Sequence, residues 1–429
     1  MTQEISDKII SKETISTLES TTDQSPTNQT TEISSASSIP TSIIDFVTQV
    51  ERTYRGLGLP VLYGTLSKLA NKSVLFISGR GTGKTRTIKC APDIQETIPK
   101  KFDAFTLDEL NSLCEQHWDA STESVHDRHF VFKVKDFSIL SEYHRDMFLT
   151  VCSGIIADGE YRHVTKVFPY LNIEHCKLTV LIAIQPRLYS LMSRRCPQWE
   201  NMSYDRFSKF LCLNPLRNGN TVEEDFVPTL SRKTPSSATL PPNMDLRKLV
   251  TLFRNQISEG RAPLYARDYA IAMARFQGRN EVNQTDIDTF HKLFSPYLES
   301  FSRLQEREDF EEAVTVSSGH MELLTEIGKH LEGITKQELC KSTRLTGEHI
   351  RRCARSLLEK ELIREEDGRY HLSTELEQFF GWYKDTFSVQ MSQPQDQKPT
   401  VQEVMQTLIT HEALPTTVQT PLTTSSDQN

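Results

Sequence analysis

The chain has 429 residues, of which 37% are hydrophobic and 25% charged, and its formal net charge is −8. This length and composition exclude a collagen-like or wholly disordered chain and leave room for two or three domains with hydrophobic cores. The acidic balance gives no general argument for nucleic-acid binding, so any such surface must be local. The apolar runs are only strand-sized and the N-terminus has no signal-peptide pattern, so we expect no membrane contact.

Residues 1–42 and 390–429 are rich in Ser, Thr and Gln and contain few large apolar side chains. Such segments bury too little apolar surface to offset the entropy of ordering, so both are expected to be disordered tails. Eight cysteines occur without a C-x-x-C pair, which gives no support for a zinc site. Most lie among apolar neighbours, so we expect reduced, buried thiols and a cytoplasmic location.

Residues 43–225 alternate strand-like apolar runs with amphipathic segments, and the runs are SVLFIS, FVFKVKDF and KLTVLIAI. This alternation is typical of an α/β fold with a parallel sheet flanked by helices. Residues 226–245 are dense in Pro and Ser and predict an irregular linker. Residues 246–306 have helical periodicity, and 315–380 predict three short helices followed by a hairpin.

The strongest motif is SVLFISGRGTGKT at 73–85, in which an apolar strand leads through a Gly-rich turn into a helix. This is the setting of a phosphate-binding P-loop, because glycines let the backbone N–H groups face the phosphates of ATP. Lys84 would reach the β- and γ-phosphates, and the hydroxyl of Thr85 would bind Mg²⁺. Ser78 stands where the strict pattern has glycine. The expected nucleotide-binding residues are Gly79, Arg80, Gly81, Thr82, Gly83, Lys84 and Thr85.

The order of the features after this loop resembles that of AAA+ ATPases over residues 45–305. In that family a strand ends in Asp-Glu, and here FVFKVKDFSIL at 130–140 offers Asp136. The resemblance implies that Asp136 holds Mg²⁺. Phe137 stands where the family has its catalytic Glu, and the run KDFS resembles a variant seen in phage- and plasmid-type AAA ATPases. Glu142, six residues after Asp136, is an alternative carboxylate.

Two further positions follow from the same resemblance. KLTVLIAIQP at 177–186 looks like the fourth strand of the family, which places Gln185 at the sensor-1 position. An amide there would orient the attacking water. NMSYDRFSKFLCLNP at 201–215 resembles the MoxR-type DRF segment. The resemblance makes Arg206 an arginine finger that acts on the nucleotide of a neighbouring subunit, which implies a homo-oligomer, such as a ring.

The helical block contains GRAPLYARDYAIAMARFQGRNEVNQTDID at 260–288, which resembles the lid of MoxR, magnesium-chelatase and MCM-type ATPases. Arg261 falls on the sensor-2 position, from which it would reach the γ-phosphate. Arg267 is the alternative. Packing alone can also explain the residue at each of these positions, since small residues such as Ala272 permit close helix packing.

The last block resembles a winged helix-turn-helix, with Asp367-Gly368 at the tip of a hairpin. The third helix of that fold enters the major groove, and arginines there would contact duplex DNA. Acidic and basic residues roughly balance over this block, so a protein-binding role stays open. The expected DNA-binding residues are His349, Arg351, Arg352, Arg355 and, on the wing, Arg369.

Together these features favour an α/β P-loop NTPase with a helical lid and a C-terminal winged helix, using ATP and Mg²⁺. The order of the three parts also resembles that of archaeal and eukaryotic replication initiators. It implies an ATP-dependent DNA transaction: replication initiation, helicase loading or plasmid maintenance. Phe137 supports an alternative, a nucleotide-gated regulator with little hydrolysis. A MoxR-like protein remodeller that uses the winged helix as an adaptor is the third possibility.

Overall fold

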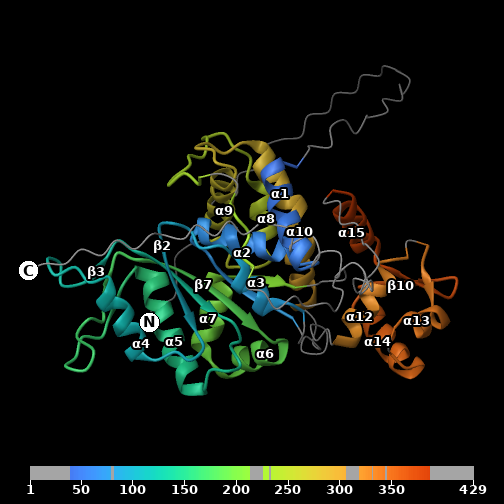
Figure 1. Ribbon diagram of the computed structural model, residues 1–429, viewed down its shortest axis with the longest axis horizontal. Coiled ribbons are helices and arrows are strands. Elements are labelled where there is room, and N and C mark those ends of the chain that lie inside the picture. The colour runs from blue at the N-terminus through green and yellow to red at the C-terminus, as the bar shows by residue number, and fades with distance from the viewer. Residues whose placement is uncertain are drawn as a thin grey trace, which may run out of the picture. The chain divides into compact units, whose positions relative to one another are not determined.

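The structure is a computed structural model that describes residues 39–78, 82–212, 226–230, 233–305, 318–330, 332–343 and 345–386. Figure 1 shows the helices and strands of these segments along the chain. In this part of the chain, every helix is too short or too polar to cross a membrane. The expected tail at 390–429 and nearly all of that at 1–42 lie outside the described residues.

A five-stranded, fully parallel sheet forms the centre of the fold, in the order β2-β4-β7-β1-β8. β1, β4 and β7 are the three apolar runs predicted from the sequence, and nearly all of their side chains are buried. Buried on both faces, such strands read as continuous apolar runs. The strands are β1 (Ser73–Ile77), β2 (Thr97–Phe102), β4 (His129–Val134), β7 (Lys177–Ile184) and β8 (Phe207–Leu211).

The strand order places the Gly-rich loop at a reversal in the sheet. From β1 the chain passes to the far edge at β2, returns through β4 to β7, and then crosses β1 to reach β8. In open α/β sheets, ligands bind beyond the carboxyl ends of the strands where the order reverses. The loop that follows Ile77 lies at that position.

Helices connect the strands of the sheet, as right-handed crossovers in parallel sheets require. With the sheet they make the α/β P-loop NTPase architecture that the sequence predicts (Figure 1). The connecting helices are α3 (Lys84–Cys90), α4 (Leu107–Gln116), α5 (Glu142–Asp158), α6 (Pro186–Arg195) and α7 (Pro197–Arg206), and α2 (Gly58–Ala70) precedes β1. A second, three-stranded sheet, not predicted, consists of β3 (Val125–His126), β5 (Tyr161–Arg162) and β6 (Asn172–Glu174).

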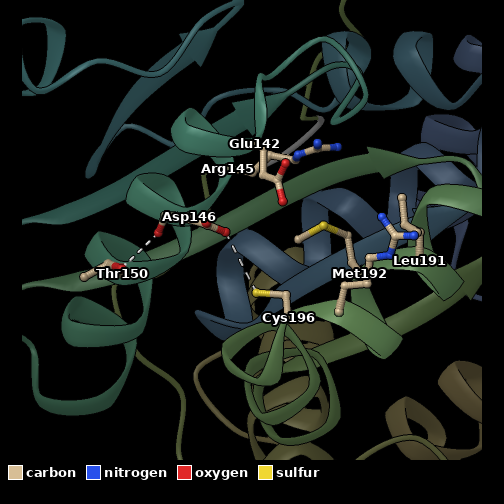
Figure 2. A pocket seen from close by; sticks show the side chains of 8 residues that line it. Glu142, Arg145, Asp146, Thr150, Leu191, Met192 and Cys196 are labelled. Carbon is tan, nitrogen blue, oxygen red and sulfur yellow. Dashed lines mark hydrogen bonds between the residues drawn. The ribbon is translucent and has the colours of Figure 1, made fainter.

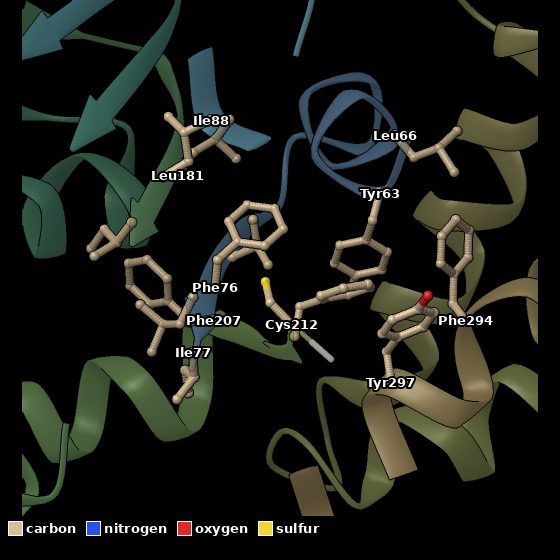
Figure 3. Close-up of a cluster of buried hydrophobic side chains, with 14 of the residues drawn as sticks. Tyr63, Leu66, Phe76, Ile77, Ile88, Leu181, Phe207, Cys212, Phe294 and Tyr297 are labelled. Carbon is tan, nitrogen blue, oxygen red and sulfur yellow. The ribbon is translucent and has the colours of Figure 1, made fainter. Parts of the chain in front are cut away.

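The helical block at 246–306, here called the lid, contains α8 (Arg247–Arg254), α9 (Ala262–Phe276) and α10 (Gln284–Gln305). It shares an aromatic core with the sheet, in which Tyr63 lies 4.7 Å from Phe210 and 5.1 Å from Phe294 between ring centroids. Figure 3 shows Tyr63, Phe294 and Tyr297 converging beside the buried strand β1. The lid therefore packs directly against the nucleotide-binding fold.

The winged-helix unit, residues 318–372, has the predicted order of three helices and a hairpin. Its helices are α12 (Ser318–Ile327), α13 (Lys336–Ser342) and α14 (Gly347–Glu359). The hairpin pairs β10 (Ile363–Glu366) with β11 (Arg369–Leu372), and β11 also pairs with β9 (Ile334–Thr335). Asp367 and Gly368 both have positive φ, as a tight hairpin turn requires.

Two helices flank these units and were not predicted. α1 (Thr41–Thr53) begins inside the segment expected to be a tail, so the expected boundary at residue 43 is two residues late. α15 (Thr374–Thr386) follows the hairpin directly and extends beyond the expected end of the last unit at 380. The linker region is irregular where the structure describes it, and Thr239 there pairs with Asn280 and Val282 of the lid.

Candidate nucleotide-binding site

The P-loop motif occupies the turn between β1 and α3. Gly79, Arg80 and Gly81 lie outside the described residues, whereas Thr82 to Thr85 are described. Gly83 has φ +94°, a conformation that glycine adopts without steric cost. A methyl group added there would lie 2.7 Å from Leu57 Cδ2, so the leucine side chain would have to move, in addition to the strain that the positive φ imposes on any other residue.

Side chains close the base of the loop. Lys84 is buried, and its ammonium group donates a hydrogen bond of 2.6 Å to the carbonyl oxygen of Ser78. Ser78, the departure from the strict motif, bonds through its hydroxyl to the hydroxyl of Thr82. Serine at 78 therefore has a structural role that glycine could not perform.

A cavity of about 230 Å³ joins residues from three places in the sequence. It brings together Lys84 and Thr85 of the loop, Asp136 after β4 and Gln185 after β7, all of which were predicted. These strands end at the same edge of the sheet, so residues just beyond them meet there. Lys135 and Ser138, which flank Asp136 in the KDFS run, also line the cavity, as does Ala183, but none of the three was predicted as a site residue.

Asp136 lies two residues beyond the end of β4, slightly later than the strand end predicted for it. Its Oδ1 accepts hydrogen bonds from the backbone N–H of Ser138 at 2.9 Å and from its hydroxyl at 2.6 Å. Thr85 donates to the carbonyl oxygen of Lys135 at 3.1 Å. A carboxylate and a hydroxyl in one cavity are the oxygen donors that Mg²⁺ accepts beside nucleotide phosphates.

Phe137 points away from this cavity into the core. Its side chain is fully buried, and its ring stacks on Trp199 with 5.4 Å between centroids. Among the described residues that line the cavity, Asp136 supplies the only carboxylate. The position that would hold a catalytic Glu in AAA+ ATPases therefore belongs to the hydrophobic core here.

Glu142, the alternative carboxylate, lines a different hollow of about 560 Å³ between α5 and α6. Figure 2 shows this hollow, in which the Oδ1 of Asp146 lies 4.0 Å from the sulfur of Cys196. The structure therefore does not bring Glu142 to the cavity of Lys84. The other lining residues are Arg145, Thr150, Leu191, Met192 and Arg195.

Arg206 lies at the amino ends of the strands, whereas the cavity of Lys84 lies at their carboxyl ends. It immediately precedes Phe207, which pairs with Ser73 at the start of β1, whereas the P-loop follows the end of β1. The strand between them spans about 13 Å, at about 3.3 Å per residue. Arg206 donates to the carbonyl oxygen of Ser153 at 3.2 Å. Burial, followed by the charge of Arg261, holds the pKa of the Arg206 guanidinium below its ordinary value.

Arg261 lies beside Arg206 rather than beside Lys84. Its Nε is 3.7 Å from the Oδ2 of Asp205, and both side chains are partly exposed. The structure therefore does not bring Arg261 to the cavity of Lys84, and its role at a γ-phosphate stays a prediction. Arg267, the alternative, bonds to Asp268, which also pairs with Lys72 just before β1. Both lid arginines therefore lie toward the amino edge of the sheet.

Buried charges anchor the far end of the P-loop helix. Lys68 donates to the carbonyl oxygens of Ala91 and Pro92 just after α3, and both Lys68 and Lys133 contact Asp93. Burial, and then the charge of Lys133, lower the pKa of Lys68 well below its ordinary value. Burial alone would raise the pKa of Asp93, but the two ammonium groups lower it. Cations near a helix C-terminus also favour the helix dipole.

Helix α14 presents the predicted basic face. Thr346 caps it by accepting a hydrogen bond from the backbone N–H of His349, and Ile350 and Leu357 face the core of the unit. Arg351, Arg352 and Arg355 are exposed, as is His349. Residues three and four apart share a helix face, so these side chains are neighbours on the surface.

The wing differs from the prediction. The guanidinium of Arg369 donates to the carbonyl oxygen of Gly333 at 3.0 Å and lies 3.9 Å from Glu338, so it is engaged within the unit. The exposed side chains of the hairpin are acidic: Glu365, Glu366 and Asp367. Any contact of this unit with DNA would therefore come from α14 rather than from the wing.

The parallel sheet, the loop at its point of reversal and the cavity beyond it define an α/β P-loop NTPase fold. No protein-family model matches the chain, and no curated protein matches its sequence. Among solved structures, RuvB of Thermotoga maritima, described as a Holliday junction branch migration motor, is 12% identical with a TM-score of 0.20; the match covers 76% of this chain and 92% of that chain. A RuvB mutant from the same organism is also 12% identical, with a TM-score of 0.20 and coverages of 78% and 94%. The fold assignment rests on the sheet and loop themselves.

Proposed function

We propose that the chain is an AAA+-like ATPase that acts on duplex DNA. The observation that carries this proposal is the cavity that joins Lys84, Thr85, Asp136 and Gln185 at the carboxyl edge of the sheet. Lys84 would bind the β- and γ-phosphates, and the N-terminus of α3 adds backbone N–H groups for the same charges. Thr85 and Asp136 would hold Mg²⁺, which when bound neutralises phosphate charge. Gln185 would orient the attacking water.

The arginine finger would come from a second copy of the chain. Arg206 is about 13 Å or more from the loop of its own subunit along β1, which supports an action in trans. The same edge carries Arg261 and the exposed apolar residues Tyr204 and Leu264. The edge around the cavity exposes Ile139 and Tyr143. Two unlike faces of this kind favour head-to-tail association, which closes into a ring if the rotation allows it.

Duplex DNA is the proposed partner of α14. Its exposed arginines offer a local positive surface on a chain whose net charge is −8. Phosphate contacts from such side chains supply affinity, and contacts to base edges supply specificity. The proposed process is an ATP-dependent DNA transaction such as replication initiation, helicase loading or plasmid maintenance.

The experiment that tests the nucleotide site compares the full chain with its Lys84→Ala variant. Loss of the main cation should weaken ATP binding or turnover by more than tenfold, which corresponds to about 1.4 kcal/mol or more. ATP affinity is measured by titration, and turnover is measured with and without duplex DNA. Equal ATP affinity and activity in the two proteins would contradict the proposal.

A second candidate is a nucleotide-gated regulator that binds ATP and hydrolyses it little. The burial of Phe137 against Trp199 favours it, because the cavity then lacks a second carboxylate among its described residues. The two candidates differ in steady-state turnover, since a regulator would bind ATP tightly and release phosphate very slowly.

A third candidate, a protein remodeller, is favoured by the acidic wing and predicts no duplex binding.

A further inference from the structure

One buried carboxylate joins three separate parts of the chain. Glu51 on α1 is 4% exposed and lies outside the sequence motifs described above. Its Oε2 accepts the backbone N–H of Gly56 at 2.6 Å, and its Oε1 accepts that of Gly58 at 2.6 Å. The hydroxyl of Tyr383 on α15 donates to the same Oε1 at 2.6 Å. A carboxylate is buried in this way only where it is hydrogen-bonded.

Space around this carboxylate is closely filled. A methyl group added at Gly58 would lie 2.7 Å from the Oε1 of Glu51 and 3.1 Å from the hydroxyl oxygen of Tyr383. Gly58 is also the first residue of α2, so the negative charge lies at the N-terminus of that helix, where the helix dipole favours it. Glu51 therefore fixes the turn at 54–58 in one arrangement.

That turn contacts the P-loop directly. Leu57 lies over Gly83, with the Leu57 Cδ2 2.7 Å from where a methyl group on Gly83 would be. Tyr54 accepts a hydrogen bond of 3.0 Å from Arg86 on α3, whose guanidinium also lies over the Tyr54 ring. The position of the turn thus sets the space available to the loop that precedes Lys84.

On its other side, Glu51 is connected to the winged-helix unit through α15. Arg364 of the hairpin bonds to the carbonyl oxygen of Leu372, to Thr374 and to Glu377, so the start of α15 is tied to the wing. Tyr383 lies nine residues after Thr374, about 14 Å along a helix of 1.5 Å rise. Between these two residues, Phe379 packs against Tyr297 of the lid, with 5.6 Å between ring centroids.

We propose that Glu51 is a positioning residue for the phosphate loop and that Tyr383 makes its position depend on the winged-helix unit. Movement of α15 on DNA binding would change the hydrogen bond from Tyr383, and the turn at 54–58 would pass the change to Gly83. This inference rests on the proposed ATP binding and names the residues that regulate it. Such a coupling is reciprocal, so ATP must change DNA affinity by the same factor.

The test uses the full chain with Tyr383→Phe, which removes the hydroxyl and keeps the ring. We expect ATP affinity to change by roughly fivefold or more, within the usual range of coupling between sites. We also expect the ratio of DNA affinities with and without ATP to approach one. Glu51→Gln, which places an amide where Gly56 donates, should produce the same direction of change.

A matched control is Tyr269→Phe. Tyr269 is a buried tyrosine of the lid whose hydroxyl bonds to Ser67 at 2.9 Å, so its loss also removes a buried hydrogen bond. It does not contact the turn at 54–58 in any interaction that the structure describes. If Tyr269→Phe changes ATP affinity as much as Tyr383→Phe, the effect is general destabilisation and the proposal fails.

Amide hydrogen exchange adds a measurement that needs no nucleotide. Exchange at Gly56 and Gly58 should rise in Tyr383→Phe and stay at the wild-type level in Tyr269→Phe. Wild-type ATP affinity and exchange in both Tyr383→Phe and Glu51→Gln, with Lys84→Ala still impaired, would overturn this inference alone. A wild-type chain that fails to bind ATP would instead overturn the proposed function, and the inference with it.

Discussion

The ring of Phe137 stacks on the indole of Trp199 with 27° between the two planes. It also packs edge-on against Phe148 of α5, so the residue after Asp136 belongs to the core between the sheet and its helices. A hydrophobic core residue therefore occupies the position at which AAA+ ATPases carry a carboxylate. Side chain 137 is directed away from the cavity by the backbone, because its N–H donates to the carbonyl oxygen of Ala183 at 2.9 Å.

Phe137→Ala should lower the free energy of unfolding by about 3–5 kcal/mol, the usual cost of truncating a buried aromatic ring. Phe137→Glu should be at least as unstable, because it buries a carboxylate, and it should not raise ATP turnover. Chemical denaturation and steady-state phosphate release measure the two effects. A stable Phe137→Glu protein with faster turnover would show that position 137 can reach the nucleotide.

Gly83→Ala should weaken ATP binding by more than tenfold, because the added methyl group meets Leu57 and the backbone has positive φ. Gly368→Ala is the matched control: it also has positive φ, at the hairpin tip, but its methyl group would enter open space. We expect the control to lose only about 1 kcal/mol of stability. Equal ATP affinities for the two variants would contradict the close contact at Gly83.

Much of the fold could be predicted from the sequence because its elements have clear local patterns. The apolar runs of β1, β4 and β7 and the Asp367-Gly368 turn have local patterns that favour the conformations they adopt. β2 and β8 were missed for opposite reasons. β2 is an edge strand that contains Pro99 and two lysines, as edges often do. β8 is fully buried but includes Ser208 and Lys209, which resemble surface residues until their partners are known.

The candidate site was predictable where a residue directly follows a strand or belongs to the loop. Lys84, Thr85, Asp136 and Gln185 meet because parallel strands end at one edge. The position of Arg261 beside Asp205 depends on how the lid packs on α2 and β8, which no local pattern encodes. The role of Glu51 could not be predicted either, because a single acidic residue on an amphipathic helix is usually exposed.

Arg206→Ala should keep ATP binding and lose hydrolysis, because its guanidinium would act on the nucleotide of the adjacent subunit. Mixing Arg206→Ala with Lys84→Ala should restore part of the activity, since mixed interfaces pair an intact loop with an intact arginine. Turnover is measured as the two proteins are titrated together. A monomeric wild-type protein with full activity, or a mixture no more active than its components, would contradict an action in trans.

Stability should rise with pH between about 7 and 10.5 because of Lys209. Burial lowers the pKa of this ammonium to about 7 from 10.5, and its Nζ bonds to the carbonyl oxygen of Gln256. Between these two pH values the unfolded chain binds a proton that the folded chain does not, so folding is favoured as pH rises. Below pH 7 both states are protonated and the penalty of burying the charge is fully present.

Lys209→Met should remove this contribution. We expect the variant to be more stable than the wild type near pH 6 and to gain less stability toward pH 10. Denaturant unfolding at a series of pH values gives both curves, and their difference isolates residue 209 from other groups that titrate in this range. Parallel curves would show that Lys209 titrates normally.

Binding of duplex DNA through α14 should be sensitive to salt and to two arginines on one face of that helix. Arg351 and Arg355 are exposed and four residues apart, so both can contact phosphates of the same duplex. In the full chain, Arg351→Ala with Arg355→Ala should reduce the slope of log affinity against log salt by about 1.8, at about 0.9 per phosphate contact. A contact to a base would instead cost about 1–3 kcal/mol at one position of the site.

The matched control is Arg247→Ala with Arg254→Ala, which removes the same charge from exposed positions on α8. Equal salt slopes for the two double variants, or wild-type affinity no greater than that of an acidic control protein, would favour a protein partner for the winged-helix unit.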